Sequence, residues 1–197
     1  PQTDAGSGSA ISTRAMTGTV QGIVSNRMAS LRSGDAYVTG MAAGSNLTAN
    51  SGFIQVFGSQ AEQDNIKLGG ITTFGFDSET KGIAIGFDGL TENGSTVGIS
   101  ASMSDTDLKG KGTGLAKNSI ESHTVSVYAD KSTDSGYVEG SLTYGINDNT
   151  GSRRVDSAGV VRSYKSNYDS QQISAKIAVG APTEVTGGTF LTPYGSL

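Results

Sequence analysis

The sequence contains no cysteine and only 3 prolines. Without cysteine, disulfide bridges and thiolate metal sites are excluded. Charged residues make up 16% of the chain, well below the roughly 25% of a typical soluble domain. The net charge of −4 offers no basic face for nucleic acid, so we expect no nucleic-acid partner. No stretch reaches the ~18 consecutive apolar residues of a membrane helix. A transmembrane strand, however, needs only about ten residues of alternating hydrophobicity.

The N-terminal region divides into two parts. Residues 1–12 are small, polar and rich in Gly and Ser, and this composition predicts a flexible linker. Residues 13–32 predict a helix, because apolar residues recur at spacings of three and four. Gly18 and Gly22 interrupt the pattern, and such a helix is marginal alone. We therefore expect it to lie against another surface. Its apolar stripe consists of Met16, Val20, Val24 (or Ile23), Met28 and Leu31.

From residue 53 onward the hydrophobic period changes to two. Val, Ile, Ala and Leu alternate with Ser, Thr, Gly and Gln in six successive segments, and a seventh begins at Thr189. This pattern predicts an antiparallel sheet with two unlike faces. The six segments are 53–64, 82–88, 97–104, 122–129, 138–146 and 172–180.

The connections between these segments alternate in length. We expect short turns at 92–95, 131–136 and 182–188, and long loops at 65–78, 107–119 and 147–165. Outer-membrane barrels have short turns at one end and long loops at the other. The apolar face is thin, which suits lipid better than a packed two-sheet core. The sequence therefore predicts an all-β protein, an antiparallel up-and-down transmembrane β-barrel with a helix before it. The residues predicted to face lipid are Ile83, Ile85, Phe87, Val97, Ile99, Val125, Val127, Leu142 and Ile177.

Several longer motifs carry a resemblance to a known family. They are SNRMASLR, GFIQVFGSQAEQD, KGIAIGFDG, TVGISASMSDTDLKGKGTG, HTVSVYAD, GYVEGSLTYGIND and FLTPYGSL. From Val24 to Leu197 the chain resembles the translocator β-domain of classical autotransporters, the type V secretion proteins of Gram-negative bacteria. The resemblance implies a twelve-stranded barrel threaded by a helix that leads out to a surface-exposed N-terminal passenger domain.

The resemblance also implies roles and partners. Residues 13–32 would be the pore helix, with Met16, Val20, Val24, Asn26, Met28 and Leu31 as its pore-lying positions. The expected partners are outer-membrane lipid, lipopolysaccharide, the protein's own passenger and the barrel-assembly machinery. No cofactor and no metal are expected. The chain would serve as membrane anchor and translocator.

Two departures from the family pattern affect these expectations. The family ends on a strand with a terminal aromatic residue, whereas this sequence stops at Leu197, inside about the seventh strand. We therefore expect residues 33–197 to be the N-terminal part of a barrel. Some members cut themselves at an Asn-Asn pair in the pore. Here Ser25 precedes Asn26, so we expect no cleavage. We expect Glu139, on the lumen side, to be solvated.

Other candidate sites carry little signal. His123 shares its face with apolar residues, which favours a structural position over a catalytic one. The KGKGTG segment has neither a Walker nor a dinucleotide spacing. Asp105 and Asp107 lack the Gly and Glu of a calcium loop. For Arg153, Arg154 and Arg162 we expect ordinary solvated charge rather than contact with anionic sugars. The sequence predicts no catalytic residue and no enzyme.

Two alternative functions remain open. One is a porin-like or adhesin barrel in the outer membrane, without a passenger. The other is a soluble all-β binding module whose polar face contacts water.

Overall fold

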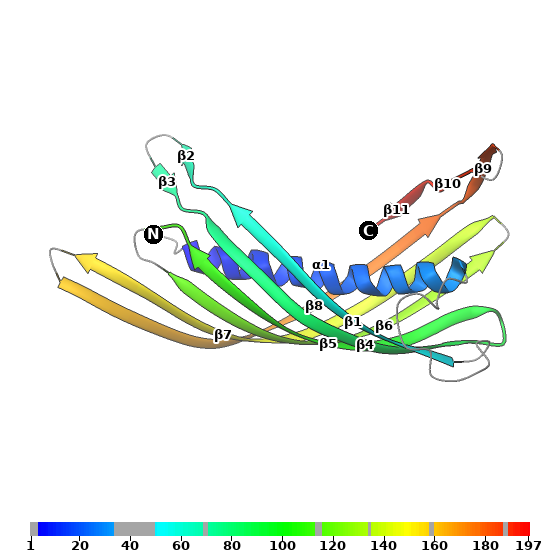
Figure 1. Cartoon of the computed structure of the whole chain (residues 1–197), viewed down its shortest axis with the longest axis horizontal. Helices are drawn as coiled ribbons and strands as arrows, with labels where there is room; N and C mark the ends of the chain where they lie inside the picture. The colour runs from blue at the N-terminus through cyan, green and yellow to red at the C-terminus, as the bar shows by residue number, and fades with distance from the viewer. Residues whose placement is uncertain are drawn as a thin grey trace.

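The structure, a computed structural model, describes residues 4–33, 50–68, 71–112, 116–133, 135–157, 160–186 and 189–197. In this part of the chain one helix precedes a seven-stranded antiparallel sheet (Figure 1). The helix is α1 (Asp4–Ser33). The sheet contains, in order, β1 (Asn50–Gln63), β4 (Phe76–Leu90), β5 (Ser95–Gly110), β6 (Lys117–Thr133), β7 (Gly136–Ser157), β8 (Val160–Gly180) and β11 (Tyr194–Ser196). Two small hairpins join β2 (Ile66–Leu68) to β3 (Ile71–Thr73) and β9 (Thr183–Thr186) to β10 (Thr189–Leu191).

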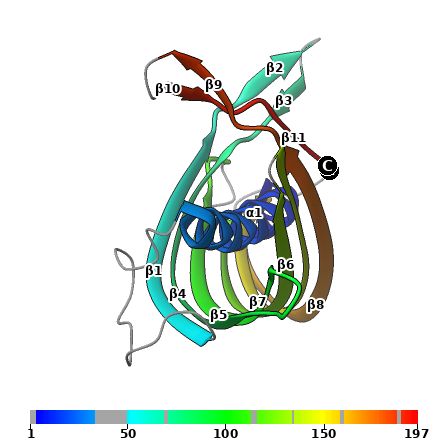
Figure 2. The ribbon, with the colours of Figure 1, turned by 90° about the vertical axis from the view of Figure 1, so that its right-hand side faces the viewer.

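The sheet curls around the helix. Seen end on, the long strands form a trough in which α1 lies lengthwise (Figure 2). Strands follow one another in the sheet in their chain order, which is the up-and-down topology of a barrel. The architecture is a curled half-barrel with a helix inside it, and it confirms the predicted fold class.

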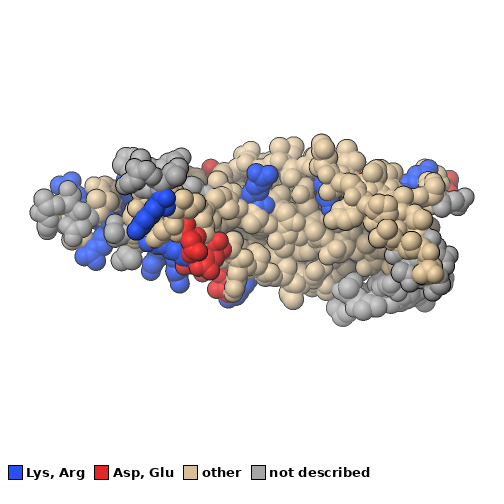
Figure 3. Space-filling view, turned by 90° about the horizontal axis from the view of Figure 1, so that it is seen from above, with Lys and Arg blue, Asp and Glu red and all other residues tan. Residues whose placement is uncertain are grey.

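The two faces of the sheet differ in composition. On β6 every second residue from Asn118 to Asp130 is buried and the residues between are exposed. The buried set faces the helix, and we refer to this concave side as the inner face and to the convex side as the outer face. The outer face is apolar in its middle. Seen from the open side of the trough, Lys and Arg side chains, with a patch of Asp and Glu beside them, gather toward the end where the hairpin of β7 and β8 protrudes (Figure 3).

A small apolar core joins helix and sheet. Val24 and Met28 of α1 pack in one cluster with Phe53, Ala84 and Tyr128 of the inner face. Inner-face glycines make room for the rings. A Cβ on Gly98 would lie 2.3 Å from Tyr128, its cross-strand partner. The same holds for Gly86 and Phe53, and for Gly82 and Phe57. Abundant glycine on the inner face thus serves aromatic packing.

The helix starts earlier than the sequence pattern predicts. It begins at Asp4, so the prediction of a flexible linker was wrong for residues 4–12. The Gly and Ser residues there have low helix propensity, but they let the helix approach the sheet. A Cβ on Gly8 would lie 2.8 Å from the Leu108 side chain. Tertiary contact thus overrides local propensity. Residues 1–3 lie outside the described part.

The predicted connection lengths need correction. The segment 147–165, expected to be a loop, is mostly strand, because β7 and β8 continue to Ser157 and from Val160. Strand pairing persists there although both faces are exposed at residues 152–155 and 160–165 and no hydrophobic period remains. Loop 65–78 contains the β2–β3 hairpin, and 107–119 shortens to the residues between β5 and β6. The predicted short turn 182–188 belongs to the β9–β10 hairpin instead.

The seventh predicted strand also shifts. Thr189 opens β10, which pairs with β9 outside the main sheet. The strand that continues the sheet beside β8 is β11, at Tyr194–Ser196. No helix among the described residues combines the length and the apolar character that crossing a membrane would need.

Candidate functional site: the helix on the inner face

The helix is held in the trough by two kinds of contact. Toward its C-terminus it carries Arg27 and Arg32, which meet carboxylates of the sheet. Toward its N-terminus the contacts to the sheet are neutral hydrogen bonds. The two halves are therefore described separately.

Arg27 forms a buried, bidentate ion pair with Asp88 of β4. Its Nε donates to Asp88 Oδ2 at 2.8 Å and its Nη2 to Oδ1 at 3.1 Å. The two side chains are 3% and 1% exposed. Nη2 also donates to Ser51 Oγ at 2.7 Å, and the Tyr128 hydroxyl donates to Asp88 Oδ2 at 3.0 Å. The guanidinium lies 5.4 Å from the Phe53 ring centroid. Each charge is thus hydrogen-bonded as burial requires.

A second group of charges lies about one and a half helical turns further on, around Arg32. Arg32 pairs with Asp130 of β6 and with Glu139 of β7, the latter at 2.9 Å, and its guanidinium stacks 3.7 Å from the Tyr137 ring. Lys176 of β8 lies 3.8 Å from Glu139 and donates to Ser25 Oγ of the helix at 2.6 Å.

We call these two groups of charges together the charged cluster. It comprises Arg27, Arg32, Asp88, Asp130, Glu139 and Lys176. Its three cations and three carboxylates balance. Because its members come from α1 and four different strands, it ties the C-terminal half of the helix to most of the sheet.

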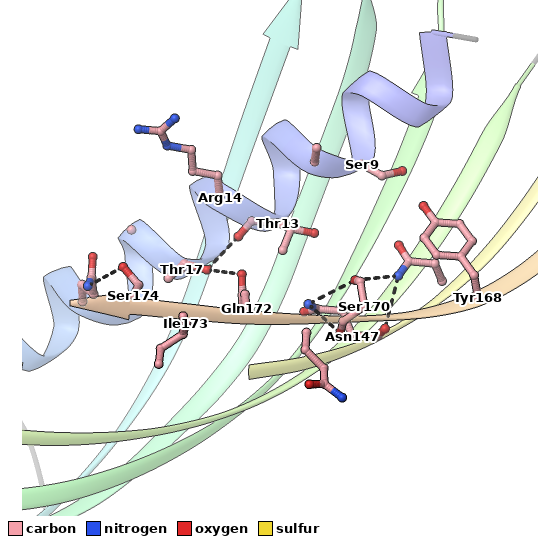
Figure 4. A pocket seen from close by; sticks show the side chains of 15 residues that line it. Ser9, Thr13, Arg14, Thr17, Asn147, Tyr168, Ser170, Gln172, Ile173 and Ser174 are labelled. Atoms are coloured by element: carbon pink, nitrogen blue, oxygen red, sulfur yellow. Dashed lines mark hydrogen bonds between the residues drawn. The ribbon is translucent and has the colours of Figure 1, made fainter. Parts of the chain in front are cut away.

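The N-terminal half of the helix meets the wall of β6 to β8 through neutral groups (Figure 4). Thr17 Oγ1 donates to Gln172 Oε1 at 2.6 Å, and just past the midpoint of the helix Gln21 Nε2 donates to Ser174 Oγ at 2.9 Å. Asn118 Nδ2 donates to Ser9 Oγ at 2.5 Å. No ion pair joins this half of the helix to the sheet within the described residues.

A cavity of about 620 Å³ lies between this half of the helix and strands β7 and β8. Its walls carry polar groups from both sides, including Thr13, Arg14, Asn147 and Gln172 (Figure 4). The space and the polarity suit bound water. The N-terminal half of the helix is thus less tightly packed than the C-terminal half.

The structure places the predicted pore-helix residues in two groups. Met16, Val20, Val24 and Met28 are between 1% and 2% exposed and face the sheet. Leu31 is half-buried and Asn26 is exposed. Their role in a pore stays a prediction.

One expectation about the inner face was wrong. Glu139 was expected to be solvated, but it is 5% exposed and pairs with Arg32 and Lys176. The arginines of the cluster were missed, although a signal existed. Arg27 lies three residues after Val24, so it falls on the apolar stripe of the helix. A charge in that position needs a buried partner.

The predicted lipid-facing residues all lie on the outer face. Eight are between 46% and 68% exposed, and Ile83 is half-buried. Strand register aligns them in rows, such as Phe87, Ile99, Val127 and Leu142. His123 lies in the outermost row, next to Met103 and Ile146. We call this surface the apolar band. Its contact with lipid stays a prediction.

A charged row bounds the apolar band toward the protruding hairpin. Its members are direct cross-strand neighbours and all are exposed: Lys81, Asp105, Glu121, Asp148 and Asp169. Beyond it, Lys111 bonds to Glu62, Asp64 and Asp77 at 2.6 to 3.2 Å. The hydrogen bond with Glu62, above all, raises the pKa of the Lys111 ammonium.

A comparison with known families gives one match. The model of the family described as "Autotransporter beta-domain" matches residues 52–197, a span that covers the sheet and both small hairpins. Comparison with curated proteins and with solved structures gave no match.

Proposed function

The chain belongs to the autotransporter β-domain family, the outer-membrane translocators of type V secretion, and from this premise we propose that it carries an N-terminal passenger domain to the cell surface and anchors it there. The observation that supports the proposal most is the helix. It runs the length of the inner face and leads from one end of the barrel wall to the other.

The orientation of the helix fits export. Its N-terminus lies at the end where β7 and β8 protrude, and its C-terminus lies at the end of the tight turn Glu92–Ser95 (Figure 1). Outer-membrane barrels have short turns on the periplasmic side and longer extensions outside. The N-terminal end of the helix therefore points out of the cell, so a domain ahead of it in the sequence would be displayed.

The charged cluster would hold the helix in the pore after export. A buried, fully hydrogen-bonded ion pair is costly to separate, because each partner left behind is an uncompensated charge. Since Arg27 and Arg32 both lie near the helix C-terminus, the anchor acts close to the periplasmic end. This arrangement supports a retained stalk and opposes an open porin-like channel.

The apolar band would contact lipid, and the proposal includes the nine outer-face residues from Ile83 to Ile177 named above. The resemblance further implies insertion by the barrel-assembly machinery and contact with lipopolysaccharide. We propose both as partners.

The experiment that tests the proposal is protease access to an epitope tag placed before Pro1, in intact Gram-negative cells that express the complete gene. We expect external protease to remove the tag while the barrel stays in the outer-membrane fraction. A protected periplasmic tag would favour a porin-like barrel. A tag in the soluble fraction would contradict a membrane role altogether.

A further inference from the structure

We infer that the outer face beyond the apolar band binds the phosphate groups of lipopolysaccharide core sugars through a row of basic side chains. The row consists of Lys109, Lys117 and Lys165, with Arg154 one step further along β7. We call these four residues the basic row. The inference rests on the proposed membrane orientation, in which this end faces outward.

Strand register brings the basic row together. Lys109 of β5 and Lys117 of β6 are direct cross-strand partners, and Ser152 of β7 separates Lys117 from Lys165 of β8. Neighbouring strands lie about 4.8 Å apart, so the lysines span roughly 15 Å across four strands. All four basic side chains are exposed on the outer side.

Lys109 has the carboxylate of Asp77 directly opposite it on β4, so the charges that lack an internal explanation are those of Lys117, Lys165 and Arg154. Like charges directly opposite each other on a sheet destabilise it, and Lys109 faces Lys117 in this way. Among the described residues, no carboxylate lies within ion-pair distance of Lys117, Lys165 or Arg154. In the adjacent row toward the apolar band, Ser119, Thr150 and Asn167 of β6 to β8 are neutral, whereas Asp107 and Glu79 continue that row on β5 and β4. An external anion would compensate these positive charges.

The position of the row indicates which anion. His123 lies in the outermost row of the apolar band, and Lys117 lies six residues further along the same strand. The distance between the two residues along the strand is about 20 Å. A strand tilt of 35–45° reduces this to roughly 15 Å above the hydrocarbon boundary. The surface is continuous with the band, so the membrane itself supplies what lies against it. In the outer leaflet that layer consists of lipopolysaccharide sugars, which carry phosphate.

The carboxylates of the charged row indicate which phosphate groups of lipopolysaccharide are bound. Asp105, Glu121, Asp148 and Asp169 lie between the band and the basic row, next to the level of the lipid A phosphates. These carboxylates repel phosphate, whereas the basic row, four residues further out, attracts it. The pattern therefore selects phosphate on the core sugars rather than on lipid A.

The test measures binding of purified complete protein, in detergent, to two probes. One is lipopolysaccharide with a phosphorylated core, and the other is a deep-rough form that has lipid A but lacks the phosphorylated core sugars. For Lys117→Gln combined with Lys165→Gln we expect roughly a tenfold or greater loss of affinity for the first probe, because each cation near an anionic surface contributes about a fivefold factor. Affinity for the second probe should stay unchanged.

Lys131 provides a matched control. It is an exposed lysine on the outer face of the same strand β6, at the opposite end. Lys131→Gln should leave both affinities unchanged, and Lys117→Arg should bind like the wild type. Equal binding of the phosphorylated probe by the double variant and the wild type would overturn the inference. So would an equal loss for both probes, or a loss in Lys131→Gln.

Failure of the inference can be told from failure of the proposed function. The tagged cells described above report display independently of these lysines. Normal display without any effect of the double variant on binding overturns the basic-row site alone. A barrel absent from the outer membrane overturns the premise and the inference with it.

Discussion

The two halves of α1 lie on the same sheet but are held by different chemistry. The C-terminal half carries buried charges that pair with carboxylates from several strands. The N-terminal half makes neutral hydrogen bonds beside a polar cavity. Breaking a buried pair costs several times more than breaking a neutral bond. The helix should therefore open first at its N-terminal end, while its C-terminal end stays fixed.

The largest effect is expected from Asp88→Asn. The change removes the charge that pairs with Arg27, whose side chain is 3% exposed. Leaving one buried charge unpaired costs about 3–5 kcal/mol. We expect the free energy of unfolding, measured by denaturant titration of the barrel in micelles, to fall by that amount.

A double variant sharpens the interpretation of Asp88→Asn. Replacing both partners, as in Arg27→Met with Asp88→Leu, removes the uncompensated charge, so the loss should be smaller than for Asp88→Asn alone. If Asp88→Asn unfolded like the wild type, the charged cluster would not anchor the helix, and the contrast between the two halves would fail.

The next largest effect is expected on the outer face, from Ile85→Arg. Ile85 lies in the middle of the apolar band and is 46% exposed. Arginine on the lipid face costs about 2–4 kcal/mol near the bilayer midplane. The same unfolding titration, done in lipid bilayers rather than micelles, measures this loss.

The Ile85→Arg variant also separates the stability of the sheet from the docking of the helix through the charged cluster. Because it leaves Arg27 and Asp88 untouched, the helix should stay docked while the barrel loses stability. Ala101 lies directly opposite Ile85, and Ile85→Ala is the size control with a smaller loss. A bilayer-assembled Ile85→Arg barrel as stable as the wild type would contradict lipid contact at this face.

A smaller effect is expected in the N-terminal half, from Thr17→Val. The change removes a hydrogen bond from Thr17 to Gln172, 2.6 Å long, which contributes about 1 kcal/mol. The chain has no cysteine, so Ser12→Cys gives a single reporter at a side chain that is 2% exposed. Thr17→Val should increase maleimide labelling of that cysteine.

Thr19 offers the control for this prediction. Its hydroxyl bonds to Ala15 O within the helix and not to the sheet. Thr19→Val should leave labelling near the wild-type level. If Asp88→Asn exposed Ser12→Cys more than Thr17→Val did, the two halves would move as one unit, and the proposed order of opening would be wrong.

The contacts of the two helix halves also show which features of the site the sequence could predict and which it could not. Periodicity is local, so it predicted the helix stripe, including Val24 and Met28, and the alternation of faces on strands such as β6. The pair of Arg27 and Asp88 joins residues 61 positions apart, and no local pattern encodes that contact. The helical conformation of residues 4–12, which include Gly8 and Ser9, could not be predicted for the same reason, since the sheet beneath stabilises it.

The smallest effect is expected at the outward tip, from Lys111→Met. Lys111 contacts three carboxylates, as many as the whole charged cluster contains, but Glu62, Asp64 and Asp77 are 70%, 90% and 56% exposed. Exposed pairs contribute little to stability and weaken with salt. The change should therefore leave the unfolding midpoint nearly unaltered, and any difference should vanish at high salt.

The pH dependence of the Lys111 contact follows from the direction of the Lys111 pKa shift. The carboxylates raise the pKa of Lys111, so the stabilisation is fully present below the ordinary lysine pKa and is lost only as pH rises through the raised value. Between neutral and mildly alkaline pH, wild type and Lys111→Met should show parallel unfolding curves. A loss as large as that of Asp88→Asn would show that the number of charges matters more than their burial. The small loss expected here would instead establish that burial makes the charged cluster an anchor.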